Sequence, residues 1–346
     1  MNARTFLGLL TLLLATAASQ AQHIYIRVSV KVITDPVTGA RPSGITDDLF
    51  YAAMASANQW MDSFGRGYRF NVTEIVNIGG PTQGGASGPS QWYGQDPRAT
   101  PEPWQTFQND INTDPRYLRR TDQVNFYITS GPSSNPGGAC PIPPGEVNLI
   151  ACMGYVDGGP WWMNHELGHF FGLSHTFGGC GCPDCSYPNS GDDGIADTLP
   201  ESSCDSQDQI ALRSFGLLYA NLSTTQQRQV DDTFFNIMSY HNASTKNQVE
   251  NVMTELQLDL HADTANSYRR AFVTGTTVFV SPFGFDLFPG TASTLPKRTV
   301  TSALTVASGA GTDIVLLRPG NYPETLTISQ PVTLRATREG PATIGK

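Results

Sequence analysis

The sequence predicts an α/β (α+β) fold in which a mixed, twisted sheet leads into a helix with a functional motif, followed by a short all-β segment. Three observations support this prediction. Runs of β-branched and aromatic residues alternate with helical patterns through the first half of the chain. A compact histidine motif lies at 165–175, and from about residue 275 the chain changes to short β runs separated by Pro and Gly. At 346 residues the chain is long for one compact core, so two folded units are expected.

The elements of the first half follow from residue periodicity. The run I-Y-I-R-V-S-V-K-V-I at 24–33 alternates as a strand does. Thr46 or Asp47 can cap a helix that runs to about Phe64, because apolar residues recur there at helical spacing. Residues 79–103 are rich in Gly, Pro, Ser and Gln, which predicts a long surface loop. The remaining predicted elements are strands at 68–78, 124–129 and 147–152, and helices at 160–172, 208–218 and 254–272.

Composition is typical of a globular, loop-rich protein. Hydrophobic residues make up 39% and charged residues 15% of the chain, with 34 Gly and 24 Pro. The formal net charge is -9 and no run of Lys or Arg stands out, so the chain lacks the electrostatic footprint of a nucleic-acid binder. We expect no nucleic-acid partner and no membrane span, because no later stretch is long and apolar enough to cross a bilayer.

The first 21 residues have the layout of a secretory signal peptide. Arg4 supplies positive charge, residues 6–15 form a short apolar run, and small residues follow through Ala21. Cleavage after Ala21 is expected, and cleavage after Ala17 is the alternative. The sequence therefore predicts a secreted, extracellular protein.

The six cysteines cluster around the histidine motif. An even number of cysteines in an exported chain favours disulfides. The alternative is a structural zinc site at Cys180, Cys182 and Cys185. The stretch from Gly178 to Pro200 has little apolar content, so it needs bridges or a cation to hold it. The disulfide candidates are Cys140, Cys152, Cys180, Cys182, Cys185 and Cys204.

Residues 165–175 read H-E-L-G-H-F-F-G-L-S-H and predict a catalytic zinc site. Positions four apart share one face of a helix, so His165 and His169 can both bind one ion. Glu166 can reach a metal-bound water without ligating the metal. Gly172 ends the helix, and the turn that follows brings His175 round as third ligand.

Three protein ligands leave a fourth position open for water, which distinguishes a catalytic zinc site from a structural one. Zinc lowers the pKa of that water from about 15.7 to roughly 7. Glu166 then accepts its proton and passes it to the leaving amine. A bare H-E-x-x-H occurs often by accident, but here half of the six histidines fall in eleven residues. The sequence therefore predicts a secreted zinc endopeptidase that acts on proteins or peptides.

The extended pattern H-E-x-x-H-x-x-G-x-x-H resembles that of the metzincin clan, and the surrounding sequence is similar to its pappalysin family. The likeness covers roughly Ile24 to Phe272 and implies a metzincin-like protease domain over 22–274. The first Pro after the segment D-G-I-A-D-T comes one place later than the resemblance leads us to expect. The segments that carry the likeness are H-T-F-G-G-C at 175–180, D-G-I-A-D-T at 193–198, N-I-M-S-Y at 236–240 and M-T-E-L-Q at 253–257.

The resemblance implies roles for two residues beyond the zinc motif. Met238 would be the methionine of the Met-turn, an apolar floor beneath the ligands; the alternative is an ordinary core methionine. Tyr240 would lie near the metal and donate a hydrogen bond to the tetrahedral oxyanion. The alternative for Tyr240 is a packed side chain with its hydroxyl satisfied. Ser239 stands where the family often has an acidic or amide residue, so the family's substrate pocket does not carry over.

A second metal is expected in the acidic loop after the zinc motif. Asp192, Asp193 and Asp197 concentrate carboxylates in a segment with little apolar content, and hard oxygen ligands suit calcium. The resemblance also implies a structural calcium, for which the candidate ligands are Asp193, Asp197 and Thr198. A solvated acidic turn is the alternative. No cysteine precedes Cys140, so we expect no cysteine-switch prosegment. The predicted α/β layer takes up the residues between the signal peptide and the zinc helix, so we also expect no long inhibitory propeptide.

Residues 275–346 resemble the opening of a right-handed parallel β-helix, similar to pectate-lyase-like domains, with a capping helix at 300–307. The β runs are T-V-F-V-S, D-I-V-L-L-R-P-G, L-T-I-S and P-V-T-L-R-A. A contact with polysaccharide is implied only by this fold analogy. The acids of the segment are scattered and form no catalytic constellation: Asp286, Asp313, Glu324 and Glu339.

Two other functions were weighed against the endopeptidase. One is a non-enzymatic adhesion or carbohydrate-binding protein with a vestigial zinc site. The presence of Glu166 argues against it, because a site that no longer catalyses a reaction does not need a general base. The other is a β-helix lyase with an accessory peptidase, but the short tail lacks convergent acids.

Overall fold

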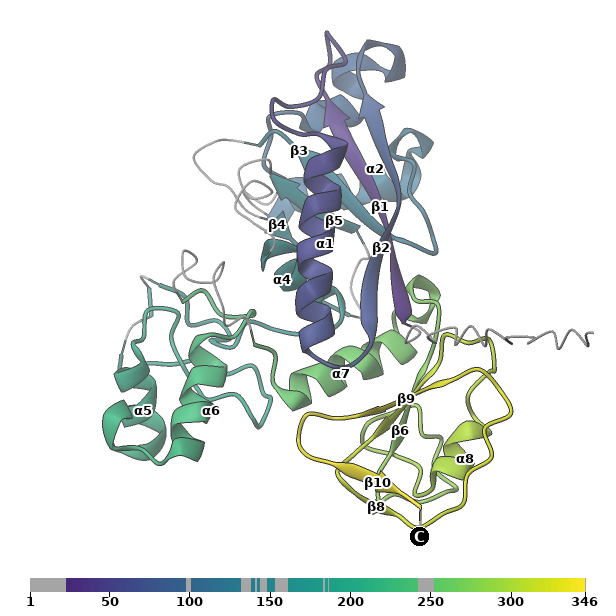
Figure 1. The fold of residues 1–346 in the computed structure, drawn as a ribbon. Coiled ribbons are helices and arrows are strands. Elements are labelled where there is room, and N and C mark those ends of the chain that lie inside the picture. Colours follow the sequence, from purple (N-terminus) through teal and green to yellow (C-terminus); the bar gives the residue numbers. More distant parts are fainter. Residues whose placement is uncertain are drawn as a thin grey trace, which may run out of the picture.

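The structure is a computed structural model. It describes residues 23–97, 101–131, 138–140, 142–143, 148–152, 161–182, 184–185, 187–241 and 252–345. The predicted signal peptide at 1–21 lies outside these residues. In the described part, the first half of the chain forms a five-stranded sheet in the order β2-β1-β3-β5-β4, in which only β4 runs antiparallel to its neighbour (Figure 1). The mixed α/β sheet that the sequence predicts is therefore confirmed. The strands are β1 (Ile24–Thr34), β2 (Tyr68–Gly79), β3 (Val124–Thr129), β4 (Gly138–Ala139) and β5 (Asn148–Cys152).

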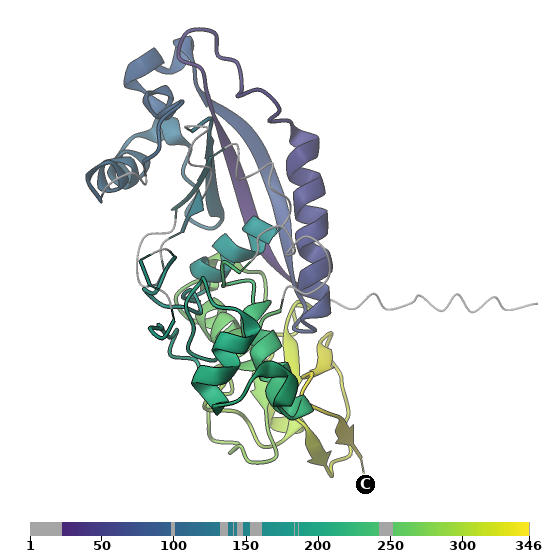
Figure 2. The same cartoon turned by 90° about the vertical axis from the view of Figure 1, so that its left-hand side faces the viewer.

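The alternating sequence of β1 explains why it lies inside the sheet. Its even-numbered residues from Ile24 to Val32 all belong to the main apolar core. Helix α1 (Asp47–Ser63) covers this face of the sheet (Figure 2). Thr46 caps α1 by accepting a hydrogen bond from the Leu49 amide, and two aspartates in the first turn favour the positive end of the helix dipole.

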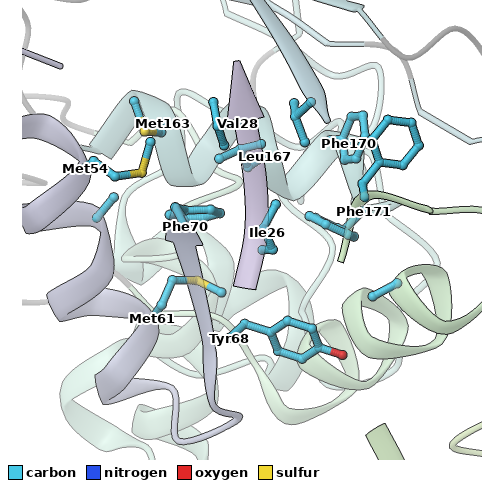
Figure 3. Packing of buried hydrophobic residues seen from close by; sticks show 14 of the residues in the cluster. Ile26, Val28, Met54, Met61, Tyr68, Phe70, Met163, Leu167, Phe170 and Phe171 are labelled. Carbon is cyan, nitrogen blue, oxygen red and sulfur yellow. The ribbon is translucent and has the colours of Figure 1, made fainter. Parts of the chain in front are cut away.

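The main core lies between α1, the sheet and helix α4 (Trp161–Phe170) (Figure 3). Met54 of α1, Val28 of β1 and Leu167 of α4 are among its buried side chains. Each fully buried side chain of this size contributes about 1.5–3 kcal/mol of apolar transfer free energy. Packing of one face of α4 into this core fixes the direction of its other face, which carries the histidine motif.

The predicted surface loop at 79–103 contains three short 3-10 turns: η1 (Pro81–Gln83), η2 (Gly85–Ser87) and η3 (Pro89–Trp92). The loop prediction is wrong at its end, where helix α2 (Pro101–Thr113) begins; the turn η4 (Pro115–Tyr117) follows it. Trp104, Phe107 and Ile111 give α2 an apolar face that packs with Trp92 and Tyr127 on the opposite side of the sheet from α1 (Figure 2). Proline at the start of α2 is tolerated because the first amide has no helical partner.

In the described residues between the histidine motif and the C-terminal segment, three helices are present: α5 (Gln207–Phe215), α6 (Thr224–Phe234) and α7 (Glu255–Asn266). The turns η5 (Tyr219–Asn221) and η6 (Arg270–Phe272) accompany them. A capping box begins each helix, at Ser206, Ser223 and Thr254. The predicted helices at 208–218 and 254–272 correspond to α5 and α7, both of which end earlier. Helix α6 was not predicted, because it is largely polar and buries only Val230 and Thr233.

The C-terminal segment folds into two small parallel sheets, β6-β7-β9 and β8-β10. The predicted runs at 277–280, 314–317 and 333–336 are strands, but L-T-I-S at 326–329 is not. Parallel pairing by itself does not make a β-helix, which stays a prediction. The elements are β6 (Thr277–Val280), α8 (Val300–Leu304), β7 (Ile314–Leu317), β8 (Gly320–Tyr322), β9 (Thr333–Ala336) and β10 (Ala342–Ile344).

The main core continues across the predicted boundary at 274. Phe279, Ile314 and Leu316 belong to the same cluster of buried residues as Ile24 and Tyr68. The hydroxyl groups of Tyr68 and Thr277 also share a hydrogen bond of 2.9 Å. The C-terminal segment is thus packed against the sheet and α7, while the exact division into domains stays a prediction.

In the described ranges, no helix combines the length and the apolar character that crossing a membrane requires.

Candidate metal centre and active site

Helix α4 presents its polar face away from the core. Met163, Leu167 and Phe170 are buried on its apolar side, and His165 and His169 lie together, with ring centroids 4.8 Å apart. Spacing of four residues places the two rings on the same side of the helix.

Gly172 ends this helix and turns the chain back. Its φ of +96° lies in the left-handed region, and a Cβ at this position would lie 2.9 Å from the hydroxyl oxygen of Thr264. The Leu173 amide donates to the Gly168 carbonyl across the turn, which closes the helix end. His175, three residues after Gly172, points back at the two helix histidines, and its ring centroid lies 4.6 Å from that of His169.

The three imidazoles converge through their Nε2 atoms. The Nε2 of His175 lies 3.0 Å from that of His169 and 3.2 Å from that of His165. Tetrahedral ligands at about 2.0 Å from zinc lie about 3.3 Å apart, close to these separations. Among the described residues, no other group of three or more His, Cys, Asp or Glu side chains brings its ligand atoms together in this way.

Hydrogen bonds behind the rings make this arrangement fit a cation. His165 Nδ1 lies 2.7 Å from the Ile237 carbonyl, and His169 Nδ1 lies 2.6 Å from the Leu173 carbonyl. Carbonyls only accept, so both Nδ1 atoms carry protons, and both Nε2 atoms present lone pairs. The Nε2 of His175 can donate a proton to the Nε2 of His165 or to that of His169, but not to both. At least two of the three Nε2 atoms therefore turn lone pairs toward each other, and a cation between them removes this repulsion. Burial also lowers the pKa of His169, which favours the neutral, ligating form.

A cavity of about 420 Å³ opens in front of the three rings. Glu166, with 3% of its surface exposed, lines this cavity together with Tyr240 and Cys140. The Tyr240 side chain is 49% exposed, and its ring centroid lies 4.6 Å from that of His175. The cavity therefore combines a metal-binding group, a carboxylate and a phenol in a space that is open to solvent.

Met238 lies directly beneath the ligand helix. It is fully buried, and a Cβ built on Gly168 of α4 would come within 2.5 Å of its sulfur atom. Asn236 fixes the turn: its Oδ1 accepts from the Met238 amide, and its Nδ2 donates to Gln257 of α7. Met238 is thus packed against the ligand helix, and its role as the methionine of a Met-turn stays a prediction.

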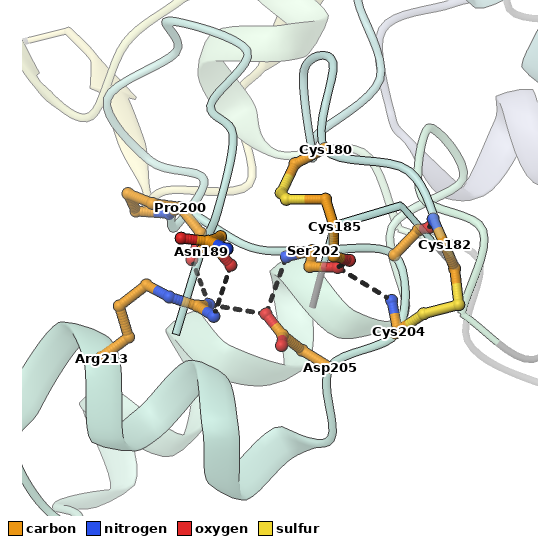
Figure 4. The surroundings of a disulfide bond; sticks show 10 residues. Cys180, Cys182, Cys185, Asn189, Pro200, Ser202, Cys204, Asp205 and Arg213 are labelled. Carbon is orange, nitrogen blue, oxygen red and sulfur yellow. Dashed lines mark hydrogen bonds and ion pairs between the residues drawn. A yellow bond between two sulfur atoms is a disulfide. The ribbon is translucent and has the colours of Figure 1, made fainter. Parts of the chain in front are cut away.

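Four of the six cysteines form two disulfides, Cys180–Cys185 and Cys182–Cys204 (Figure 4). Both bridges hold the loop with little apolar content that follows the histidine motif. The prediction of disulfides in this loop is therefore confirmed for these four cysteines. The alternative of a structural zinc site at Cys180, Cys182 and Cys185 is therefore not the arrangement found, because these sulfur atoms are used in disulfides.

The remaining two cysteines take no part in these bridges. Cys140 lines the cavity, and burial raises the pKa of its thiol, with the charge of Glu166 acting in the same direction. The side chain of Cys152 lies outside the part of the structure that is described.

The candidate calcium ligands are engaged by the protein itself. Asp193 accepts hydrogen bonds from the Ile195 amide and from the Thr198 hydroxyl, at 3.0 Å and 2.6 Å. Asp197 accepts from the Thr254 hydroxyl and from the Leu256 amide at the start of α7. These carboxylates tie the acidic loop to α7, and calcium stays a prediction.

One group near the site was missed by the sequence reasoning. The Glu201 carboxylate is buried and contacts Thr176, Ser239 and His241, which adjoin His175 and Tyr240 in the chain. No periodic pattern marks an isolated buried acid in an irregular loop. The only signal available was its position three residues after the D-G-I-A-D-T segment.

Comparison with known proteins finds likeness in structure only. No family model and no curated protein matches the chain. It is similar to mature mirolysin of Tannerella forsythia in complex with a cleaved peptide, at 15% identity and a TM-score of 0.44, over 73% of this chain and 96% of that one. It is also similar to metalloproteinase-II of Bacteroides fragilis, at 13% identity and a TM-score of 0.28, over 45% of each chain.

A third similar structure is archaemetzincin of Methanopyrus kandleri, at 14% identity and a TM-score of 0.25, over 46% of this chain and 77% of that one. At such scores the likeness carries no argument of its own. The functional case rests on the geometry of the three histidines, and membership of the pappalysin family stays a prediction.

Proposed function

We propose that the chain is an exported, zinc-dependent endopeptidase. One observation carries the proposal: three Nε2 atoms converge in an open cavity that is also lined by Glu166. A closed structural metal site would leave no room for substrate, whereas a cavity of about 420 Å³ accommodates several atoms of a peptide chain.

His165, His169 and His175 would hold the zinc ion through Nε2, a donor set that suits this metal. When bound, zinc supplies a water of lowered pKa and polarises the scissile carbonyl. The carbonyls of Ile237 and Leu173 orient two of the rings from behind, so the ligands are arranged before the metal arrives.

Glu166 would act as the proton carrier. Its carboxylate accepts a proton from the attacking water and gives it to the nitrogen of the leaving amine, so one residue serves as base and then as acid. Glu166 follows His165 in the chain and lines the same cavity, so its carboxylate would lie next to the reacting atoms. Because Glu166 belongs to α4, the packing of this helix into the core also sets where the carboxylate lies.

Tyr240 would stabilise the tetrahedral intermediate by donating its hydroxyl proton to the oxyanion. Its ring centroid lies 5.6 Å from that of His165 and 4.9 Å from that of Phe177. These contacts restrain the ring, while about half of the residue stays exposed, which suits a group that must meet substrate.

The proposal does not extend to polysaccharide. In the C-terminal segment the carboxylates of Asp286, Asp313 and Glu324 all accept hydrogen bonds from backbone amides, so they serve the fold. Export rests on the sequence of the leader and on the two disulfides.

The test is hydrolysis of a peptide library by purified protein, with and without a chelator, beside Glu166→Ala. We expect the chelator to abolish cleavage and Glu166→Ala to lower turnover by about three orders of magnitude or more, because both proton transfer and water positioning are lost. Glu166→Ala should still bind zinc, since the carboxylate is not a ligand.

Glu102→Gln is the matched control, because Glu102 is an exposed acid on α2, outside the cavity. It should cleave as the wild type does. Unchanged hydrolysis by Glu166→Ala, or active protein without zinc, would overturn the mechanism. Zinc bound by the wild type without any hydrolysis would favour the non-enzymatic alternative.

A further inference from the structure

Glu201 is a fully buried acid: 0% of its side chain is exposed. One carboxylate oxygen accepts hydrogen bonds from the hydroxyls of Thr176 and Ser239, the latter at 2.9 Å. The other oxygen lies 2.6 Å from His241 Nε2. A buried carboxylate is costly unless its oxygens are satisfied, and these three groups supply that compensation from two different loops.

The three residues that contact Glu201 are chain neighbours of His175 or of Tyr240. Thr176 follows the third candidate ligand, His175, in the chain. Ser239 and His241 flank Tyr240 on both sides. The Thr176 amide also donates to the Met238 carbonyl, so the two loops meet at backbone level next to the carboxylate.

The position of Glu201 is fixed from its own side. Its backbone pairs with Gly191 through two hydrogen bonds, of 2.8 Å and 3.0 Å. Gly191 packs so closely on the Phe177 carbonyl that a Cβ there would come within 1.9 Å of the oxygen. The next residue, Ser202, donates to the Cys185 carbonyl within the disulfide-linked loop (Figure 4). The carboxylate is therefore held through several contacts of its own loop, and Glu201 itself is not among the residues that line the cavity.

Tyr240 is half exposed, so burial alone does not fix its position. Its chain neighbours are fixed instead. Ser239 and His241 are both buried and both contact Glu201, and the His241 ring stacks on Phe234 at 4.5 Å. Buried, fully satisfied polar networks specify one arrangement of the groups that they join.

We propose that Glu201 is a positioning residue that fixes Tyr240 and the third ligand, His175, relative to each other. The inference rests on the proposed function, because it concerns the same site. Glu201 does not touch substrate or metal; it acts through Thr176, Ser239 and His241. Groups that support metal ligands from behind typically change metal affinity by 10–100-fold when they are removed.

The experiment compares wild-type protein with Glu201→Gln, which keeps the size of the side chain but removes its charge and one acceptor. We expect the zinc dissociation constant, measured by competition with a chromogenic chelator, to rise by about 10-fold to 100-fold. With zinc saturating, kcat should fall about tenfold or more with KM little changed, as for loss of an interaction made in the transition state.

Two further variants separate positioning from stability. Asp205→Asn is the matched control: Asp205 is also a buried acid of this loop, but it pairs with Arg213 at 2.6 Å, away from the cavity. Its loss should lower stability and leave zinc affinity and kcat unchanged. Ser239→Ala removes one donor beside Tyr240 and should lower kcat in the same direction as Glu201→Gln, so it serves if that variant does not fold.

The double variant with Tyr240→Phe tests the route of the effect. If Glu201 acts through Tyr240, Glu201→Gln should lower kcat much less in the Tyr240→Phe background than in the wild type. Additive losses in kcat, together with unchanged zinc affinity, would overturn the inference. So would a Glu201→Gln protein that behaves like Asp205→Asn. A wild type that binds no zinc or cleaves nothing contradicts the proposed function instead, which keeps the two failures apart.

Discussion

Two regions of this molecule hold irregular backbone in place by different means. Around the candidate metal centre, the described residues of 176–206 include few buried apolar side chains, and two disulfides and buried carboxylates hold them. The C-terminal segment, 276–345, has its own apolar cluster, which includes Val278, Val300 and Leu317. The first region is held by cross-links and charges, and the second by a small core.

The carboxylates of the two regions show what this difference means for function. Asp286 accepts from the amides of Arg298 and Thr299, and so replaces backbone hydrogen bonds that the irregular chain cannot make. Glu166 instead lines an open cavity beside three histidines. An acid whose oxygens serve the protein's own amides supports the fold, whereas an acid that faces a cavity is available for chemistry.

The largest effect is expected from His169→Ala, which removes one candidate ligand. Zinc occupancy should fall sharply and hydrolysis by about three orders of magnitude or more, because the metal no longer has three protein ligands. Metal analysis and peptide cleavage measure this, with His23→Ala as a control at a residue that does not line the cavity. Amide exchange of β6 and β7 should stay as in the wild type; loss of their protection would mean that the two regions depend on the same metal.

Arg66→Ala tests how the C-terminal segment is joined to the rest. Arg66 is 3% exposed and pairs with Glu255 and Asp259 of α7, while Arg318 of the segment also pairs with Asp259. Removing it takes one partner from the buried carboxylate of Asp259 and one from the partly buried Glu255, so the free energy of unfolding should fall by about 3–5 kcal/mol.

The matched control for Arg66→Ala is Arg69→Ala, since Arg69 forms an ion pair with Asp62 in which both side chains are 38% exposed. That loss should be about 0–1 kcal/mol in denaturant unfolding. Equal losses in the free energy of unfolding for the two variants would show that burial of the Arg66 ion pairs does not increase their contribution to stability.

The disulfides should differ in their contribution according to loop length. Cys182–Cys204 joins residues 22 apart and Cys180–Cys185 residues 5 apart. Loop-closure entropy predicts losses of about 3 kcal/mol and about 2 kcal/mol for the corresponding Cys→Ser pairs. Thermal unfolding of the two double variants measures the difference. A reversed order would indicate that strain or residual structure outweighs chain entropy here.

A pH dependence, which is absent at neutral pH, is expected from His261 of α7. Burial, helped by the charge of Arg66, lowers the pKa of His261 to about 3. The unfolded chain binds a proton at this residue below about pH 6.5, but the folded chain does not until about pH 3. Stability therefore falls as pH drops through this window, by about 2–3 kcal/mol at pH 4.5.

His261→Phe should remove this part of the pH dependence, because phenylalanine cannot titrate and fits between Tyr68 and Phe171. Urea unfolding at pH 7 and pH 4.5 checks it. An unchanged difference between the two pH values would exclude His261 as the source.

Much of the fold could be predicted from the sequence because periodicity reports burial. The alternation in β1 and the helical spacing in α1 correspond to faces that the structure buries. Helix α6 escaped prediction because its stability comes from capping and tertiary contact, which leave little apolar pattern. Helix α2 was missed because it follows a Pro-rich stretch that reads as loop.

The candidate site was predictable to a similar depth. The spacing of His165, Glu166 and His169 encodes a helix face, and Gly172 encodes the turn that brings back His175. Contacts between loops that are distant in sequence leave no comparable spacing pattern. Glu201 meets Ser239 and His241 across about forty residues of sequence, and only folding brings them together.

The closeness of Gly168 to Met238 has a consequence for how the ligand helix can vary. A single methyl group at position 168 would occupy space that the sulfur atom already fills, at 2.5 Å. Either the thioether swings aside or the helix moves away from it and takes two imidazoles with it. The two positions thus form one steric unit, and a larger residue in the helix calls for a smaller one in the turn below.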